Sequence, residues 1–319
     1  MRYTSRVRAV TIADRRITVA EHPAPAPGRG ELGIRVRAAG LNGADIMQVR
    51  GHYPAPAGVV PNIPGLELAG EVVAVGDGAT RFRSGARVMA LTPGGAQAQI
   101  AVVHESLAMP VPDGLDWNAA GGFPEAFITA HDALISQCEL HSGERLLVNG
   151  AAGGVGTAAV QIGVGAGARV VASVRATARR QAVSALGAQV IDPQEIAEAG
   201  PFDVILELVG AVNFPANLRA LATGGRISVI GVGAGARIEL DLGQLMGRRG
   251  RFLGSTLRAR PLEERAIAVR RVETEVLPLL ETGRLRVLVQ DVFALEAAAD
   301  AYARFQAGAK LGKIVLSIG

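Results

Sequence analysis

The chain has almost no cysteine. Cys138 is the single cysteine among 319 residues, so no disulfide can form within the chain, and no Cys-x-x-Cys pair is available for a structural zinc site. This composition is typical of a reducing compartment, and we expect a cytoplasmic protein. The first residues, MRYTSR, also lack the apolar core of a secretion signal.

Aromatic residues and blocks of like charge are scarce as well. Phe, Trp and Tyr make up 4% of the residues, which argues against an extended stacking platform for nucleic acid. The net charge is +4, but no run of five like charges occurs, so the basic residues indicate a solvated face rather than a nucleic-acid patch. Hydrophobic residues account for 49% and charged residues for 19%, which predicts a sizeable core.

Residues 146–156, LLVNGAAGGVG, are typical of a buried strand, a glycine turn and the start of a helix. The N–H groups at the start of such a helix can bind a pyrophosphate. Ala151 replaces the first glycine of the G-x-G-x-x-G pattern, whereas Gly153 leaves room for a phosphate and Gly156 allows close helix packing. The apolar segment 169–174 completes a βαβ unit. We therefore predict a dinucleotide site here and no membrane span.

The segment after the second strand bears on the choice of cofactor. A site for NAD usually carries an acidic residue here to bind the ribose 2′-hydroxyl. Residues 172–181 contain no acid, but they contain Arg175, Arg179 and Arg180. Guanidinium groups bind a 2′-phosphate, so the pattern favours NADPH, although some of these arginines could belong to a solvated helix face.

The remaining pattern predicts an α/β protein with a doubly wound parallel sheet and a β-rich first part. Short apolar runs separated by Gly and Pro fill the first 120 residues, a helix is expected over 123–134, and strands and helices alternate from residue 146. A helix over 263–280 and a strand over 311–316 that returns to the first domain close the chain. We expect a β-rich first domain over 1–121, a nucleotide-binding domain over 122–264, and a return to the first domain over 265–319.

The chain resembles the zinc-free quinone oxidoreductases of the medium-chain dehydrogenase/reductase superfamily over essentially its whole length. The motifs are GLNGAD at 40–45, PGLELAG at 64–70, AAGGVG at 151–156 and GKIV at 312–315. Four further segments are most similar to the tumour-suppressor-induced quinone oxidoreductase subgroup: DIMQ at 45–48, GGAQA at 94–98, PEA at 124–126 and STLR at 255–258. The resemblance implies a GroES-like β-rich catalytic domain, a Rossmann domain, and a homodimer formed through the nucleotide-binding domains.

The resemblance also implies an activity. Zinc-binding relatives carry a cysteine and a histidine where this chain has Asn42 and Leu66, so we expect no metal and a zinc-independent transfer of hydride from NADPH to a quinone. An enoyl-thioester or enone reductase on the same scaffold is the alternative. A different class, an NADPH-regulated RNA-binding or crystallin-like protein, stays open because of the basic pI, although a nucleic-acid partner is not favoured.

The resemblance assigns site residues by position. Asn42 and Tyr53 are the candidate catalytic residues, although Asn42-Gly43 could be a simple turn and Tyr53 a packed loop aromatic. Glu67 is expected to be a structural hydrogen-bond acceptor, and Lys313 could be a surface lysine. The residues expected to bind the cofactor are Asn42, Thr129, Gly153, Gly154, Val155, Arg175, Arg179, Gly231, Val232 and Lys313.

Overall fold

The computed structural model describes residues 6–319, which form two compact units. Unit 1 contains the described residues up to Glu125 together with Leu257–Gly319, and unit 2 is Ala126–Thr256. The sequence placed the changes of domain after residues 121 and 264. The second change comes earlier because helix α9 (Leu262–Glu275) packs on strand β7 (Ala108–Pro110) and the short helix before it, both in unit 1.

Unit 2 is built on a six-stranded parallel sheet in the order β10-β9-β8-β11-β12-β13. The strands are β8 (Arg145–Asn149), β9 (Arg169–Ser173), β10 (Gln189–Ile191), β11 (Phe202–Glu207), β12 (Leu221–Val229) and β13 (Arg251–Gly254). The direction of winding reverses between β8 and β11, which makes the carboxyl ends of these two strands the switch point where open α/β sheets bind ligands. The predicted doubly wound sheet is confirmed.

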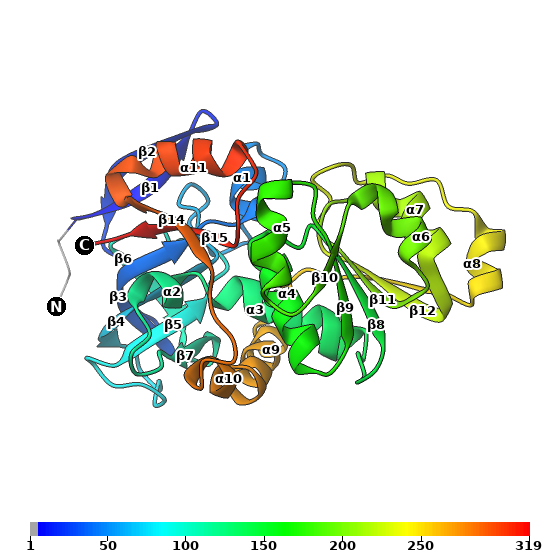
Figure 1. Cartoon of the computed structure of the whole chain (residues 1–319). Helices are drawn as coiled ribbons and strands as arrows, with labels where there is room; N and C mark the ends of the chain where they lie inside the picture. Colours follow the sequence, from blue (N-terminus) through cyan, green and yellow to red (C-terminus); the bar gives the residue numbers. More distant parts are fainter. Residues whose placement is uncertain (1–5) are drawn as a thin grey trace. The chain divides into compact units, whose positions relative to one another are not determined.

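Helices cover both faces of this sheet (Figure 1). Helices α4 (Gly154–Gly165) and α5 (Thr177–Ser184) lie on one face, and α6 (Ile196–Ala199) and α7 (Phe214–Ala220) lie on the other. The central residues of β8, β9 and β11 are mostly apolar and buried because both faces of the sheet are covered. Leu147, Phe202 and Ile227 form part of the resulting core and are completely buried. Helix α8 (Leu242–Arg248) follows β12.

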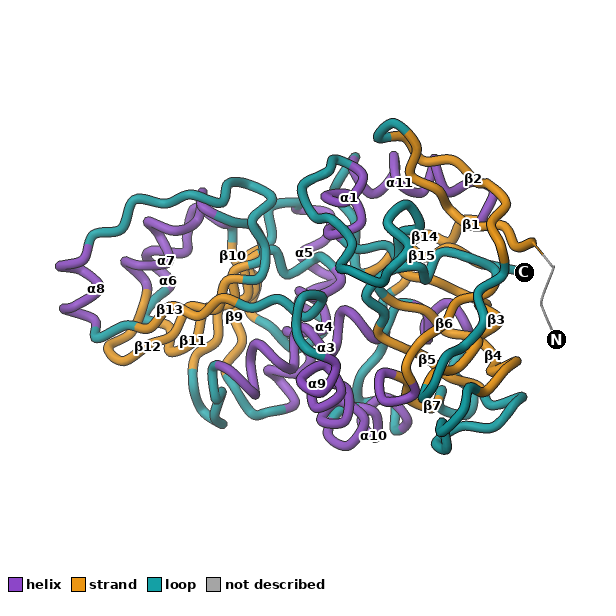
Figure 2. The backbone as a smooth tube through the Cα atoms, turned by 180° about the vertical axis from the view of Figure 1, so that it is seen from behind, coloured by secondary structure: helices purple, strands orange, loops and turns teal. Residues whose placement is uncertain are grey.

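Unit 1 is β-rich, as the sequence predicts. Its seven-stranded sheet runs in the order β14-β15-β3-β4-β5-β7, with β6 paired to β3, and a separate hairpin joins β1 to β2. Figure 2 shows these strands from behind. The bounds are β1 (Arg6–Ala13), β2 (Arg16–Pro23), β3 (Glu31–Gly40), β4 (Glu67–Val75), β5 (Arg87–Leu91), β6 (Ile100–His104), β7 (Ala108–Pro110), β14 (Val289–Ala294) and β15 (Lys313–Ser317).

The last strand brings the end of the chain back to its beginning. Strand β15 pairs antiparallel with β3, so that Val315 lies opposite Gly40. The predicted return strand is therefore confirmed, and it places Lys313 beside the loop that follows β3. The short helices of unit 1 include α1 (Gly43–Val49), α2 (Trp117–Gly121) and α11 (Ala298–Gln306). No helix within residues 6–319 is long and apolar enough to cross a bilayer.

Two predicted helices differ in detail from the structure. The segment expected as one helix over 263–280 is two helices, α9 and α10 (Leu277–Glu281). Pro278 has no N–H to continue the first helix, and the break falls at Val276, which caps both. The helix expected over 123–134 is α3 (Pro124–His131), which continues as a π-helical segment over Asp132–Gln137. Such wider turns are rare and occur often at functional sites.

Candidate active site

The glycine turn of unit 2 connects the end of β8 to the start of α4. Gly153 is the N-cap of α4. A Cβ on Gly156 would lie 2.5 Å from the Gly150 carbonyl oxygen, so a glycine is needed there for close packing. A Cβ on Gly153 would meet nothing nearer than that same oxygen at 3.6 Å. Because the protein does not fill the space at Gly153, and the first N–H groups of a helix have no partner within it, the turn fits a pyrophosphate.

A buried carboxylate joins this turn to the neighbouring strand. Glu207, at the end of β11, is 2% exposed. Its Oε2 accepts hydrogen bonds from Asn149 Nδ2 at 2.8 Å and Asn217 Nδ2 at 2.7 Å, and its Oε1 accepts from the N–H groups of Val209 at 2.7 Å and Gly210 at 2.8 Å. Asn149 is the last residue of β8. Glu207 therefore fixes the two strand ends at the switch point.

The three arginines after β9 have different surroundings. Arg180 donates to the Val174 carbonyl oxygen and forms an ion pair with Asp192, which directly follows β10. Arg175 is exposed in the loop between β9 and α5, and Arg179 is half-buried in the first turns of α5. Arg180 is thus used by the protein itself. The acidic residue near the end of β9 is Asp192, which follows β10. It lies outside residues 172–181, the segment from which the sequence predicts the cofactor.

The other expected cofactor residues of unit 2 lie on α3 and after β12. Thr129 is 8% exposed on α3. A Cβ on Gly231 would lie 2.1 Å from the Leu208 carbonyl oxygen, so the loops after β11 and β12 approach closely there. Val232, the next residue, is 37% exposed. These positions belong to unit 2 with the glycine turn, whereas Asn42 and Lys313 belong to unit 1.

In unit 1, Asn42, Glu67 and Lys313 form a buried hydrogen-bonded group. Asn42 Nδ2 donates to Glu67 Oε1 at 2.8 Å, and Lys313 Nζ donates to Asn42 Oδ1 at 2.6 Å and pairs with Glu67 Oε1 at 2.5 Å. The side chain of Glu67 is fully buried and that of Lys313 is 4% exposed. Gly40 leaves space for the carboxylate, since a Cβ there would lie 2.2 Å from Glu67 Oε1.

The ammonium group of Lys313 has three acceptors, all within unit 1. The third is the Leu41 carbonyl oxygen at 3.0 Å. A lysine ammonium has three N–H donors, so each has a protein acceptor. Lys313 is therefore not a surface lysine, and a bond to a cofactor would require one of these three bonds to break. Glu67 is the structural acceptor that the sequence predicts.

Two further carboxyl groups lie near this group. Asp45 is fully buried and accepts hydrogen bonds from the N–H groups of Asn42 at 2.8 Å and Gly65 at 3.0 Å. Burial raises the pKa of Asp45 to about 6. Glu125 is partly buried, and its backbone N–H donates to Glu67 Oε2 at 2.9 Å. Burial, followed by repulsion from Glu67, raises the pKa of Glu125 to about 8.

Arg258 holds the loop that carries Tyr53. Its side chain donates to the carbonyl oxygens of Pro93 at 2.6 Å and Tyr53 at 3.1 Å, and to Gln48 Oε1 at 2.8 Å. The guanidinium carbon lies 5.1 Å from the centre of the Tyr53 ring. Arg258 is 7% exposed, and burial lowers its pKa. We call Asn42, Asp45, Glu67, Glu125, Arg258 and Lys313 the polar cluster of unit 1.

Comparison with known proteins agrees with this architecture. The alcohol dehydrogenase GroES-like domain model matches residues 28–136, and the zinc-binding dehydrogenase model matches residues 154–274. The quinone oxidoreductase of Pseudomonas aeruginosa is 30% identical over 91% of this chain and 92% of its own length. An alcohol dehydrogenase superfamily protein from Novosphingobium aromaticivorans superposes with a TM-score of 0.86 at 28% identity, covering 99% of this chain and 100% of that one.

A longer relative also matches. A phenolphthiocerol/phthiocerol polyketide synthase from Mycobacterium tuberculosis is 32% identical over 92% of this chain, but the match spans only 14% of that protein. The two family models and the full-length quinone oxidoreductase decide the classification.

The chain belongs to the medium-chain dehydrogenase/reductase superfamily. It is an oxidoreductase with a GroES-like domain and a Rossmann domain, and its fold binds a nicotinamide cofactor. The resemblance to the zinc-free quinone oxidoreductases, and to one subgroup of them, stays a prediction.

At the two positions where we expect zinc-binding relatives to carry ligands, this medium-chain dehydrogenase/reductase holds unsuitable side chains. Leu66 is buried and has no ligand atom, and the Asn42 amide is bonded to Glu67 and Lys313. A divalent cation beside Asn42 would be repelled by the Lys313 ammonium. In the part of the chain from Arg6 onward, no group of three or more His, Cys, Asp or Glu residues could hold a metal ion. The residues present do not fit a catalytic zinc ion.

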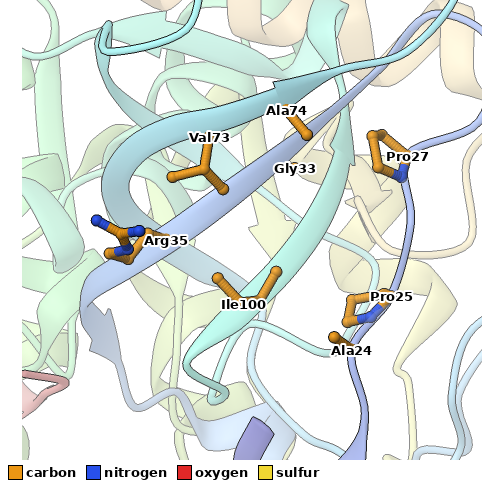
Figure 3. A pocket seen from close by; sticks show the side chains of 8 residues that line it. All are labelled: Ala24, Pro25, Pro27, Gly33, Arg35, Val73, Ala74 and Ile100. Atoms are coloured by element: carbon orange, nitrogen blue, oxygen red, sulfur yellow. The ribbon is translucent and has the colours of Figure 1, made fainter. Parts of the chain in front are cut away.

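A separate hollow lies on the sheet of unit 1, under the proline-rich loop (Figure 3). Its volume is about 160 Å³. The lining residues are Ala24, Pro25, Pro27, Gly33, Arg35, Val73, Ala74 and Ile100. The hollow shares no residue with the polar cluster, and its walls are mostly apolar.

Sequence reasoning missed several members of these sites. It gave no role to Glu125, Arg258, Asn149 or Glu207. A signal was present for two of them, because Asn149 and Glu207 are polar residues at the ends of otherwise apolar strand segments. Such residues are buried only when they are hydrogen-bonded, and both are.

Proposed function

We propose that this medium-chain dehydrogenase/reductase is an NADPH-dependent, zinc-independent quinone reductase. Unit 2 binds the cofactor at its glycine turn, and the polar cluster of unit 1 provides the groups that bind the acceptor. The bound cofactor supplies the hydride. The observation that carries the proposal is the Lys313 ammonium, which stands hydrogen-bonded between Asn42 and Glu67 where a zinc enzyme needs ligands.

The absence of a Lewis acid restricts the acceptor. Zinc polarises a carbonyl and so helps a hydride to move to or from a simple alcohol carbon. Without zinc, the acceptor itself must stabilise the electron pair that it receives. A quinone or an enone does so, because the charge is delocalised onto oxygen. The protein then contributes mainly positioning and hydrogen bonds.

The hydrogen bonds of Asn42 define what it can offer such an acceptor. Its Oδ1 accepts from Lys313 and one Nδ2–H donates to Glu67. An amide nitrogen carries two N–H groups, so Asn42 retains one N–H donor. We propose that this N–H binds the acceptor carbonyl or the cofactor ribose. Tyr53, held by Arg258, is proposed to stack on the acceptor or polarise it.

We propose that Arg175 and Arg179 select NADPH by binding its 2′-phosphate. A charge-assisted hydrogen bond contributes about 1.5–3 kcal/mol, so Arg175→Ala should weaken NADPH binding about 10-fold to 100-fold and leave NADH binding unchanged. Arg169, exposed at the opposite end of β9, gives the matched control Arg169→Ala. Equal losses for both cofactors would contradict this assignment.

We further propose a homodimer formed through unit 2. Strand β13 ends the parallel sheet and pairs only with β12 among the described strands, and an exposed strand edge can pair with another chain. Ile238, Leu242 and Met246 are 47%, 64% and 76% exposed in the segment just before β13. Light scattering should give twice the chain mass, and Met246→Asp should shift it toward the monomer.

The test of the function is oxidation of NADPH by purified protein with a panel of quinones, enones and enoyl thioesters, and with NADH in parallel. Rapid turnover with quinones that survives exhaustive treatment with a chelator is the expected result. The mycobacterial polyketide synthase match favours an enone or enoyl-thioester acceptor as the second candidate. Turnover of those acceptors alone would select it, and loss of activity on chelation would refute the zinc-independent reaction.

A further inference from the structure

The polar cluster contains three carboxyl groups, and their surroundings differ. Both oxygens of Asp45 accept backbone hydrogen bonds, from Asn42 and from Gly65. Both oxygens of Glu67 are also occupied, Oε1 by Asn42 and Lys313 and Oε2 by the N–H of Glu125. These two carboxyl groups are used to hold the backbone and side chains of the site in place.

The carboxyl group of Glu125 is different. Neither of its oxygens has a hydrogen-bond partner within residues 6–319, and the residue is partly buried rather than enclosed. Its backbone is held at a fixed position by the bond to Glu67, which in turn binds Asn42 and Lys313. A side chain anchored in this way, with its own polar atoms uncommitted, is placed to exchange a proton with a bound molecule.

We propose that Glu125 is the catalytic acid that protonates the acceptor oxygen during reduction. This inference rests on the proposed reductase function and adds a residue to it. The electron pair arrives with the hydride at the conjugated carbonyl system and moves toward the carbonyl oxygen. The O–H bond of Glu125 breaks as its proton forms a new bond to that oxygen. The hydride brings two electrons and one proton and Glu125 brings the second proton, which balances the conversion of a quinone to a hydroquinone.

The protonation state of Glu125 suits this role. Burial and the nearby Glu67 raise its pKa to about 8, so the group is mostly protonated at neutral pH. A general acid is most effective when its pKa lies near the working pH. After the transfer, the carboxylate regains a proton from water because it is partly exposed. Lys313 cannot take this role without breaking one of its three bonds.

The experiment compares the wild-type protein with Glu125→Gln in steady-state oxidation of NADPH by an enone and a quinone. General acid catalysis typically contributes about 10²-fold or more. We therefore expect Glu125→Gln to lower kcat by about that factor at pH 7, with a small change in the KM for the acceptor. The wild-type kcat should fall as the pH rises through about 8, and this fall should be absent in Glu125→Gln. Glu125→Asp should restore part of the activity.

Two measurements separate this role from damage to the fold. Infrared difference spectra at pH 7 should show a protonated carboxyl band in the wild type that is missing from Glu125→Gln. Glu281, an exposed carboxylate on α10, gives the control Glu281→Gln, which should leave kcat and its pH profile unchanged. If Glu125→Gln kept the wild-type kcat and profile, the proposal would be overturned. A wild-type protein that reduced no acceptor would instead refute the reductase function itself.

Discussion

Glu125 also makes the stability of unit 1 depend on pH. Its pKa is raised from an ordinary value of 4.5 to about 8, so the folded chain holds this proton more tightly than the unfolded chain does. Between these two pH values the unfolded state binds fewer protons, and the free energy of unfolding therefore decreases as the pH rises. The contribution of Glu125 to the free energy of unfolding is fully present below pH 4.5 and is lost as the pH passes 8.

The size of the effect follows from the same values. One pKa unit corresponds to about 1.4 kcal/mol, so Glu125 lowers the free energy of unfolding by up to about 1.4 kcal/mol per pH unit between pH 5 and pH 8. The cumulative loss has an upper limit of about 5 kcal/mol, which water around the partly exposed carboxyl reduces. Glu125→Gln has no proton to lose and should be more stable than the wild type at pH 8.5.

Trp117 makes the measurement specific to unit 1. It is the only tryptophan of the chain and lies on α2, in the same unit as Glu125. Urea unfolding is followed by tryptophan fluorescence at a series of pH values. For each variant this gives the change in the free energy of unfolding per pH unit. The difference between the wild type and Glu125→Gln isolates Glu125 from the histidines, which both share. Parallel pH dependences of the free energy of unfolding in the two proteins would refute the raised pKa of Glu125.

Three further substitutions test the sites. Lys313→Met leaves the fully buried Glu67 without its cation and should cost about 3–5 kcal/mol, whereas Lys313→Met combined with Glu67→Gln should recover part of this loss in urea unfolding. Gly40→Ala places a methyl group 2.2 Å from Glu67 Oε1; we expect a lower melting temperature and at least a 10-fold loss of NADPH oxidation, since a shift of about 1 Å in a site can cost 10²-fold. Glu207→Gln replaces a carboxylate oxygen, which accepts hydrogen bonds, with an amide nitrogen that faces the same N–H donors. We expect the free energy of unfolding to fall by about 2 kcal/mol or more, and a fluorescence titration to show weaker NADPH binding.

Much of the fold could be predicted from the sequence because the local patterns agree with the final structure. Most strands of unit 2 contain a short apolar run, and each strand is separated from the next by a helix, which identifies a parallel sheet. The exceptions come from local details that periodicity does not register. Pro278 divides one amphipathic segment into α9 and α10, and the helix from Pro124 widens into a π-helical turn at Asp132.

The sites were less predictable because their contacts are distant in sequence. The glycine turn is contained in residues 146–156 and could be recognised there. Lys313 and Asn42, in contrast, are 271 residues apart, and Asn149 and Glu207 are 58 apart. No local pattern indicates that Lys313 binds Asn42, so a contact with the cofactor was the natural expectation. Only the pairing of β15 with β3 brings the ammonium to the loop that follows Gly40.

The charges of the polar cluster connect its structure to its proposed chemistry. Lys313 and Arg258 provide two positive charges, while Glu67 and, above pH 6, Asp45 provide two negative charges. Glu125 would add a third negative charge, and repulsion by Glu67 and Asp45 is part of what keeps it protonated. The positive and negative charges of the cluster are equal in number only when Glu125 is neutral. Glu125 therefore holds a proton at neutral pH that it can donate. The Lys313 ammonium provides charge but no coordination position, so in the proposed zinc-independent reaction the acceptor stabilises the hydride electrons by itself. The proposed conjugated carbonyl substrate and the proposed proton transfer from Glu125 thus both follow from this one arrangement of charges.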